Sequence, residues 1–419
     1  MRQDRPKFSA QERYVPSSKT SRVFHFGMLG VQLIAGTASE AIKQKVGLQS
    51  EKDYQQGKSG IAKYALNERN ANRLAESFRK MRGAALKIGQ ILSTSEESVL
   101  PPVMRDAMEK ARSEADIMPI KQVVRIFETA YGADWQKNFK EINLYPFAAA
   151  SIGQVHEAVL TDGTRVALKV QYTGIANSID SDLDNFKMLV DVLGVFPRGL
   201  YLDELIKVSR SELHDECDYE REAEYQIKYH NACIVSPEKY YAPRVIEHMS
   251  NKEILCTEFV DGVEIDTLMQ EPQEVRDRVG ALMLELCFRE LFEWKVMQTD
   301  PNPANYLYEK DIGKLNLLDF GAGRDFSDEF LGDYIEVIHG SYMSDKDKII
   351  DNSLKLGFLT GEENKEMINA HYTGVMIVGE PFRTPTSDDL YNFGTADFTE
   401  KVVKILPTMS KHRLTPPPQ

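Results

Sequence analysis

The most restrictive feature of this 419-residue chain is a β-hairpin expected over residues 154–172. Two segments, QVHEAVL and TRVALKVQY, alternate apolar with polar residues and are rich in β-branched side chains, which is typical of strands. The Asp162-Gly163 pair between them favours a tight turn. A run of small residues, Ala148–Ser151, precedes the first strand, and Lys169 lies on the second. The segments before residue 140 have a helical pattern, expected over Asn67–Ser93, Val103–Ser113 and Ile120–Tyr131, so we predict the α+β class.

Two acidic motifs follow much later in the chain. TDPNPAN contains Asp300 with Asn305 five residues on, and LLDFGAG contains Asp319 before Phe320. Together with VALK on the hairpin, they have the order of the lysine, D-x-x-x-x-N and D-F-G motifs of protein kinases. Mg²⁺ prefers oxygen ligands, so Asn305 and Asp319 are suited to hold the metal of a bound nucleotide. Asp300 is suited to orient or deprotonate an attacking hydroxyl or water.

An acidic segment lies between the lysine strand and these motifs. We expect SELHDECDYEREAEYQ to form one helix that carries Glu216, Asp218 and Glu222. A nucleotide site of this type needs a carboxylate beside its lysine, and this helix has the chain position of the kinase helix that supplies it. The alternative is a solvated acidic helix face.

Composition excludes some classes of function. The formal net charge of −13 argues against a general nucleic-acid binder. The four cysteines contain no C-x-x-C pair, so they fit neither a zinc site nor a disulfide framework and favour a reducing compartment. In the stretch VFHFGMLGVQLIAGTASEAIKQKVG, the apolar part is broken by His25, Gln32 and Thr37 and is shorter than the roughly 20 residues that a membrane-spanning helix needs. It predicts either a core helix with close glycine packing or a helix on a membrane surface, with Lys19 and Arg22 at its start.

A second glycine-containing helix is expected at MRGAALKIGQILS. It tolerates Gly83 and Gly89, although each glycine costs about 1 kcal/mol relative to alanine inside a helix. Lys87, Gly89 and Gln90 interrupt its apolar face. Composition and periodicity leave the reason for these interruptions open.

These motifs together resemble the UbiB/ADCK group of atypical protein-kinase-like proteins, and most closely its coenzyme Q (ubiquinone) biosynthesis branch. The resemblance covers nearly the whole chain and rests on KIGQ, AAAS, ECD, TDPNPAN, LLDFGA and RLTPPP. It implies a bilobal protein-kinase-like fold with a family-specific helical extension over the active site. The expected segments are a membrane-associated N-terminal segment, the extension with the K-x-G-Q motif, an N-lobe with the alanine-rich loop and hinge, and a mainly helical C-lobe, at residues 1–60, 61–140, 141–260 and 261–419.

The resemblance also implies roles for individual residues. The catalytic residues are Asp300, Lys169 and Lys87, and Glu222 pairs with Lys169. Asn305 and Asp319 bind Mg²⁺. The remaining nucleotide contacts come from the alanine-rich loop and the hinge, namely Ala148, Ala149, Ala150, Ser151, Thr257, Glu258, Phe259 and Val260. The K-x-G-Q motif (Lys87, Gly89, Gln90) lies across the cleft, where Lys87 pairs with Glu216 or Asp218 of the E-x-D motif and closes the cleft to peptide substrates.

The chain departs from ordinary kinases where a peptide substrate would bind. H-R-D is replaced by QTD, no A-P-E motif follows Asp319, and a helical pattern resumes almost at once. We therefore expect an ATPase that binds Mg²⁺ and ATP and supports ubiquinone biosynthesis at a membrane surface, without phosphorylating proteins in trans. The alternatives are a phosphotransferase acting on a small molecule or lipid, and a nucleotide-binding scaffold.

The resemblance finally implies partners and a location. The expected partners are membrane lipids, ubiquinone precursors and the enzymes of ubiquinone biosynthesis, with a homodimer as one possible assembly and no nucleic acid. The location is either the matrix side of the mitochondrial inner membrane or the cytoplasmic face of a bacterial inner membrane.

Overall fold

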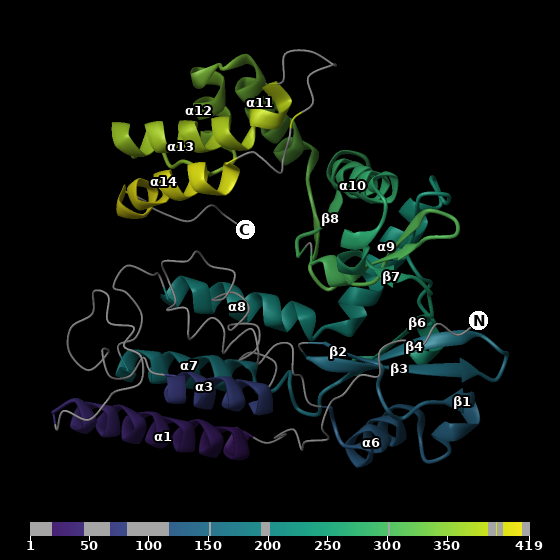
Figure 1. Ribbon diagram of the computed structural model, residues 1–419. Coiled ribbons are helices and arrows are strands. Elements are labelled where there is room, and N and C mark those ends of the chain that lie inside the picture. Colours follow the sequence, from purple (N-terminus) through teal and green to yellow (C-terminus); the bar gives the residue numbers. More distant parts are fainter. Residues whose placement is uncertain are drawn as a thin grey trace. The chain divides into compact units, whose positions relative to one another are not determined.

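The computed structural model in Figure 1 describes residues 19–45, 68–81, 117–150, 152–193, 202–300, 302–383, 391 and 397–412. The chain forms two compact units. Unit 1 is Met1–Leu282 with Gln298–Gly323, and unit 2 is Met283–Met297 with Arg324–Gln419. Several predictions lie outside the described residues, namely the helix at Val103–Ser113 and the placement of Lys87, Gly89, Gln90 and Ser151.

The predicted hairpin is present at the centre of a five-stranded antiparallel sheet in unit 1. Its strands are β3 (Gly153–Leu160) and β4 (Arg165–Gln171), in register from Gly153 opposite Gln171 to Val159 opposite Arg165. The order is β1-β3-β4-β6, and β2 also pairs with β3. The other bounds are β1 (Phe139–Ile142), β2 (Ala148–Ala149) and β6 (Ile254–Glu258). The turn uses Gly163 with φ +91°, which glycine adopts without steric cost.

The alternation along β4 separates the core from the site. Val166, Leu168 and Val170 are buried in the main hydrophobic core. Successive strand residues point to opposite faces of a sheet, so Ala167 and Lys169 face the other way, where both line a cavity. Helix α6 (Ile120–Tyr131) has the predicted bounds and adds its apolar face to the same core.

A buried histidine in this core is expected to make unit 1 sensitive to acid. Burial lowers the pKa of His156 to about 4, and its ring contacts Asn143 O and Gln154 Nε2 at 3.0 and 2.9 Å. The unfolded chain binds a proton near pH 6.5 and the folded chain does not, so stability falls as the pH drops from about 6.5 to 4. We expect a loss of about 2 kcal/mol by pH 5, at roughly 1.4 kcal/mol per pH unit. Denaturant unfolding at several pH values measures this.

The matched variants for this prediction are His156→Leu and His339→Gln. His339 is half exposed and lies on α11 of unit 2, so its replacement should not remove the part of the pH dependence of stability that comes from His156. His156→Leu should flatten it. An equal slope for the parent and His156→Leu would contradict the assignment.

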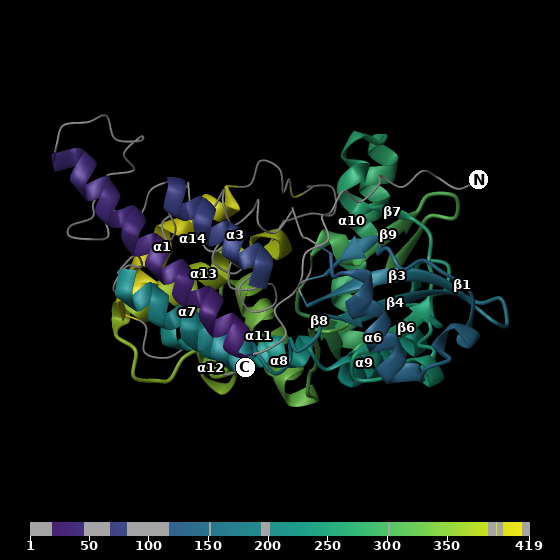
Figure 2. The same ribbon diagram turned by 90° about the horizontal axis from the view of Figure 1, so that it is seen from below.

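Helix α1 (Lys19–Lys45) packs against α3 (Glu68–Met81) and α7 (Ile179–Leu193), as Figure 2 shows. A Cβ added to Gly36 would lie 2.2 Å from Asn70 Oδ1, so the predicted close glycine packing of a core helix is confirmed. Arg22 is fully buried and forms an ion pair with Asp182 of α7. Arg22, which was expected at the start of a possible membrane-surface helix, is therefore neutralised inside the protein.

The opposite face of α1 exposes Phe24, Met28, Val31 and Ile34. These four positions recur at helical spacing, so they form a continuous apolar stripe. No helix in the described ranges is long and apolar enough to cross a membrane.

The single acidic helix expected around the E-x-D motif is wrong. Helix α8 (Leu202–Glu216) ends at the first residue of the motif, and α9 (Tyr219–Cys233) begins three residues later. The Asp218 carboxylate accepts the backbone N–H of Arg221 at 3.0 Å. An aspartate that caps a helix in this way starts a new helix, which explains the break.

A second sheet in unit 1 has the order β5-β10-β9-β7. Its strands are β5 (Tyr240–Tyr241), β7 (Val263–Glu264), β9 (Tyr306–Glu309) and β10 (Lys314–Leu317). Unit 1 also contains the short helices η1 (Trp135–Asn138), which precedes β1, and η2 (Glu247–Met249), η3 (Ile265–Gln270) and η5 (Pro303–Asn305). Helix α10 (Gln273–Phe288) and the paired strands β8 (Val296–Gln298) and β11 (Gly323–Asp325) carry the chain from one unit to the other.

Unit 2 is helical. Its elements are η4 (Arg289–Trp294), α11 (Asp328–Met343), α12 (Lys346–Lys355), α13 (Lys365–Val378), η6 (Glu380–Arg383) and α14 (Phe398–His412). Val337, Ile349 and Leu356 form a hydrophobic cluster there. The predicted return to helix after D-F-G is confirmed, because Ser327 caps α11 through Phe330 N and only residues 320–327 separate Asp319 from that helix.

Candidate active site

One cavity of about 410 Å³ in unit 1 collects most of the predicted site residues. It lies between elements far apart in sequence: the alanine-rich turn, strands β4 and β6, helix α9 and the two acidic motifs. The predicted residues that line it are Ala148, Ala149, Ala150, Lys169, Glu216, Glu222, Thr257, Glu258, Phe259, Val260, Asp300, Asn305 and Asp319. Asp218 caps α9 and is not among the lining residues.

Lys169 is held by two carboxylates. Its Nζ lies 2.7 and 2.9 Å from the two oxygens of Glu222 and 3.6 Å from Asp319 Oδ2. Burial alone would lower the pKa of Lys169, but the charges of Asp319 and Glu222 outweigh it and raise the pKa well above its usual range. The lysine is therefore a fixed positive charge at neutral pH. The predicted pairing with Glu222 is present, and Glu222 itself is 1% exposed.

The β9–β10 hairpin brings the two acidic motifs together. Asn305 directly precedes β9, and Asp319 follows β10 by two residues. Tyr306 pairs with Leu317, so the residues that flank the hairpin lie next to each other. Leu318 N accordingly donates to Asn305 O at 2.9 Å. The amide Nδ2 of Asn305 donates to Asp300 O at 3.2 Å. The three residues therefore form one cluster.

This cluster offers the oxygen donors that Mg²⁺ prefers. No group of three or more His, Cys, Asp or Glu side chains suited to a metal occurs in the described parts of the chain. Mg²⁺ commonly binds through one or two carboxylates together with phosphates and water. The carboxylate of Asp319 and the amide oxygen of Asn305 fit that donor set.

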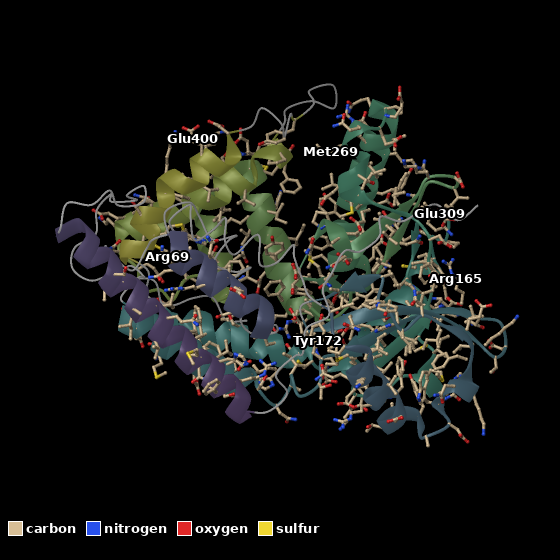
Figure 3. All side chains as sticks on the ribbon, turned by 60° about the horizontal axis from the view of Figure 1, so that its bottom comes forward. Arg69, Arg165, Tyr172, Met269, Glu309 and Glu400 are labelled. Carbon is tan, nitrogen blue, oxygen red and sulfur yellow. The ribbon has the colours of Figure 1, made fainter. Side chains whose placement is uncertain are left out.

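The alanine-rich segment forms a tight turn beside the lysine. Ala148 pairs with Val155 and Ala149 with Gln154, and Ala150 N donates to Gly153 O at 2.8 Å. Tyr172, labelled in Figure 3, follows β4 and donates its N–H to Ile152 O at 2.8 Å. The turn is therefore tied to both strands of the hairpin.

Gly153 is required at the end of this turn. A Cβ there would lie 2.6 Å from Val170 O and 2.7 Å from Tyr219 Oη. Gly153→Ala should therefore lower the free energy of unfolding by about 1–3 kcal/mol, the usual cost of overpacking. Gly280→Ala is the matched control, since nothing lies within 4 Å of that added Cβ and alanine favours helix by up to about 1 kcal/mol. Equal stability of Gly153→Ala and the parent in denaturant unfolding would contradict the steric argument.

The predicted hinge follows β6. The Glu258 carboxylate accepts from Arg244 Nε at 2.7 Å and from the Tyr241 hydroxyl. The Arg165 guanidinium lies 3.8 Å from the centre of the Phe259 ring. Arg165, labelled in Figure 3, begins β4. Both side chains are thus held by neighbours. The backbone N–H groups of Glu258 and Phe259 also donate to Arg244 O and Arg165 O, both at 2.9 Å, so a flat base would rely on other polar groups of the hinge, such as the backbone of Val260.

Sequence analysis missed the apolar walls of the cavity. These are Val155, Ala167 and Leu255 of the sheet and Ile152 directly before β3, with Leu307 of β9 and Leu318 directly after β10. A signal existed, because Leu307 and Leu318 each lie within two residues of a predicted metal ligand. Sequence analysis also missed Phe320 and Tyr229. Phe320 is buried, and its ring lies 5.0 Å from the ring of Tyr229 on α9.

The sequence of this chain matches a known family of kinase-like domains. Residues 110–353 match the family model of the ABC1 atypical kinase-like domain. The chain belongs to the ABC1 family. The predicted UbiB/ADCK resemblance, the α+β class and the kinase-like fold are thereby confirmed.

This ABC1 chain is similar to several atypical kinases. It is 43% identical to "Atypical kinase coq-8, mitochondrial" of Caenorhabditis elegans, over 98% of this chain and 54% of that protein. It is 40% identical to "Atypical kinase COQ8B, mitochondrial" of Rattus norvegicus, over 99% and 77%. The chain spans about half of the C. elegans protein and 64% of the Danio rerio COQ8B protein.

A solved structure shares the fold. The complex of Rv3197 with erythromycin from Mycobacterium tuberculosis is 24% identical, with a TM-score of 0.51, covering 82% of this chain and 91% of that one. At this identity the likeness supports the ABC1 fold and no more.

Proposed function

We propose that this chain binds Mg-ATP and acts as a kinase-like ATPase that supports ubiquinone biosynthesis at a membrane surface. The observation that carries the proposal is the convergence of the Lys169–Glu222 pair with Asp300, Asn305 and Asp319 on one cavity. These are the residue types that phosphoryl transfer from ATP requires. The names of the COQ8 relatives support the pathway and a mitochondrial location.

Each polar residue has a distinct task in this proposal. Lys169, held charged by Glu222 and Asp319, binds phosphate oxygens and orients them. Asn305 and Asp319 hold the magnesium ion, which when bound neutralises charge on the phosphates. Asp300 orients an attacking water or hydroxyl and accepts its proton. The base of the nucleotide fits between the sheet wall and the wall formed by Leu307 and Leu318.

Hydrolysis is favoured over protein phosphorylation in trans. Helix α11 begins at Asp328, so the described chain has no long segment after Asp319 on which a peptide substrate would lie. The pairing of Lys87 with Glu216 or Asp218 would close the cleft further and is part of the proposal. Asp218 caps α9, which leaves Glu216, on the cavity wall, as the better partner.

Membrane lipids, ubiquinone precursors and the enzymes of ubiquinone biosynthesis are the partners we propose. The exposed apolar stripe of α1 supports contact with a membrane surface, because exposed apolar patches commonly mark interaction sites. In a mitochondrial host the proposed location is the matrix side of the inner membrane.

An ATPase assay tests the proposal. Purified protein is assayed with and without anionic liposomes and ubiquinone-like phenols, and all phosphorylated products are traced. Steady phosphate release without a phosphorylated product supports the ATPase. A phosphorylated phenol or lipid would instead establish the phosphotransferase, and nucleotide binding without turnover would leave the scaffold.

A further inference from the structure

One buried glutamine connects the two acidic motifs. Gln298 ends β8, directly before Thr299-Asp300, and is 3% exposed. Its Nε2 donates to Asp319 O at 2.9 Å, and its Oε1 lies 3.4 Å from Asp300 N. One side-chain amide thus contacts the backbone of the proposed base and the backbone of the proposed metal ligand. In QTD, Gln298 stands where H-R-D has histidine.

An arginine holds the same segment from α9. The Arg221 guanidinium donates from Nη1 to Gly321 O at 2.8 Å and from Nη2 to Gly323 O at 2.6 Å. It also stacks on the ring of Tyr225 at 4.6 Å. Arg221 directly precedes Glu222, the partner of Lys169. A single helix therefore carries both the lysine's partner and the anchor of the segment that follows Asp319.

The glycines of this segment fit that anchor. A Cβ on Gly323 would lie 2.5 Å from the Tyr225 ring, so only glycine permits the close approach to α9. Gly321 N donates to Asp319 Oδ1 at 3.0 Å. The orientation of the Asp319 carboxylate therefore depends on the backbone at Gly321, whose carbonyl Arg221 holds.

We propose that Gln298 and Arg221 are positioning residues for Asp319. Gln298 fixes the Asp319 backbone from β8, Arg221 fixes residues 321 and 323 from α9, and the carboxylate is thereby aimed at the metal before nucleotide binds. The proposal rests on the function proposed above. Residues that orient a metal ligand typically contribute about 10- to 100-fold to metal affinity, although they do not touch the ion.

The test measures the Mg²⁺ dependence of nucleotide binding. A fluorescent ADP analogue is titrated into the parent, Gln298→Met and Arg221→Met at a series of Mg²⁺ concentrations and in EDTA. Methionine keeps much of each side chain's volume and removes its hydrogen bonds. We expect the Mg²⁺ concentration for half-maximal binding to rise about 10-fold or more in each variant, with the metal-independent affinity within about twofold of the parent.

Two milder substitutions separate positioning from general loss of stability. Gln298→His restores a donor to Asp319 O and should recover most of the Mg²⁺ dependence. Arg221→Lys keeps the charge but has no fork to bridge two carbonyls, so it should recover little. Asn352→Leu is the control for stability, because it removes a buried amide that donates to Lys348 O at 2.8 Å within α12 and that does not line the cavity. It should leave the Mg²⁺ dependence unchanged.

The outcomes distinguish this inference from the proposed function. A parent protein that binds no nucleotide with Mg²⁺ would overturn the proposed function. A parent that binds, with the same Mg²⁺ dependence in folded Gln298→Met and Arg221→Met, would overturn the positioning role alone. If either methionine variant fails to fold, an unchanged Mg²⁺ dependence in Arg221→Lys, or a raised Mg²⁺ requirement in Gln298→His, would also count against the positioning role.

Discussion

Asp319→Asn should remove nearly all Mg-dependent nucleotide binding and turnover. The substitution keeps the side chain's shape but removes the negative charge, from which a hard cation gains most of its binding energy. It also removes one of the two carboxylates beside Lys169. We expect turnover to fall about 100-fold or more, as when a single electrostatic stabiliser is removed from an active site. Phosphate release and the Mg-ATP shift in melting temperature measure the effect.

Asp311→Asn is the matched control. Asp311 is exposed in the turn of the same β9–β10 hairpin, so it undergoes the same change of charge on the same element. Its turnover and thermal shift should match the parent. Undiminished stabilisation of Asp319→Asn by Mg-ATP would show that Asp319 does not bind the metal.

Arg22→Met should destabilise unit 1 by about 3–5 kcal/mol, the usual cost of removing one partner of a buried ion pair. Arg22 and Asp182 are 0% and 1% exposed, and they join α1 to α7. Burial raises the pKa of Asp182 to about 6 despite the Arg22 charge, so the carboxylate left alone would be strongly disfavoured. The free energy of unfolding in denaturant measures the loss.

Two comparisons sharpen this experiment. The double variant Arg22→Met with Asp182→Leu should recover much of the loss, because no uncompensated charge remains. Arg210→Met removes a more exposed arginine that pairs with Asp180 and Asp184, and exposed pairs contribute about 0–1 kcal/mol. Equal destabilisation by Arg22→Met and Arg210→Met would contradict the special role of the buried pair.

Local patterns were sufficient for the elements whose partners are close in sequence. The β3–β4 hairpin follows from strand alternation and the Asp162-Gly163 turn, and both are present. The bounds of α6 agree with the prediction because its apolar periodicity is strong and its ends are marked by Pro119 and Gly132. The break between α8 and α9 was missed, because helical periodicity continues through the motif while the cap at Asp218 depends on one hydrogen bond.

The sequence by itself determined which chemical groups this protein has and in what order: a strand lysine, an acidic helix, D-x-x-x-x-N and D-F-G. Their meeting in space depends on contacts between distant segments. The register of β9 with β10 joins Asn305 to Asp319, the start of α9 at Asp218 sets the position of Glu222, and Gln298 joins two motifs through backbone atoms. Backbone carbonyls are the same at every residue, so the letters of a sequence do not reveal which carbonyl a buried side chain will bind; only the tertiary structure decides that.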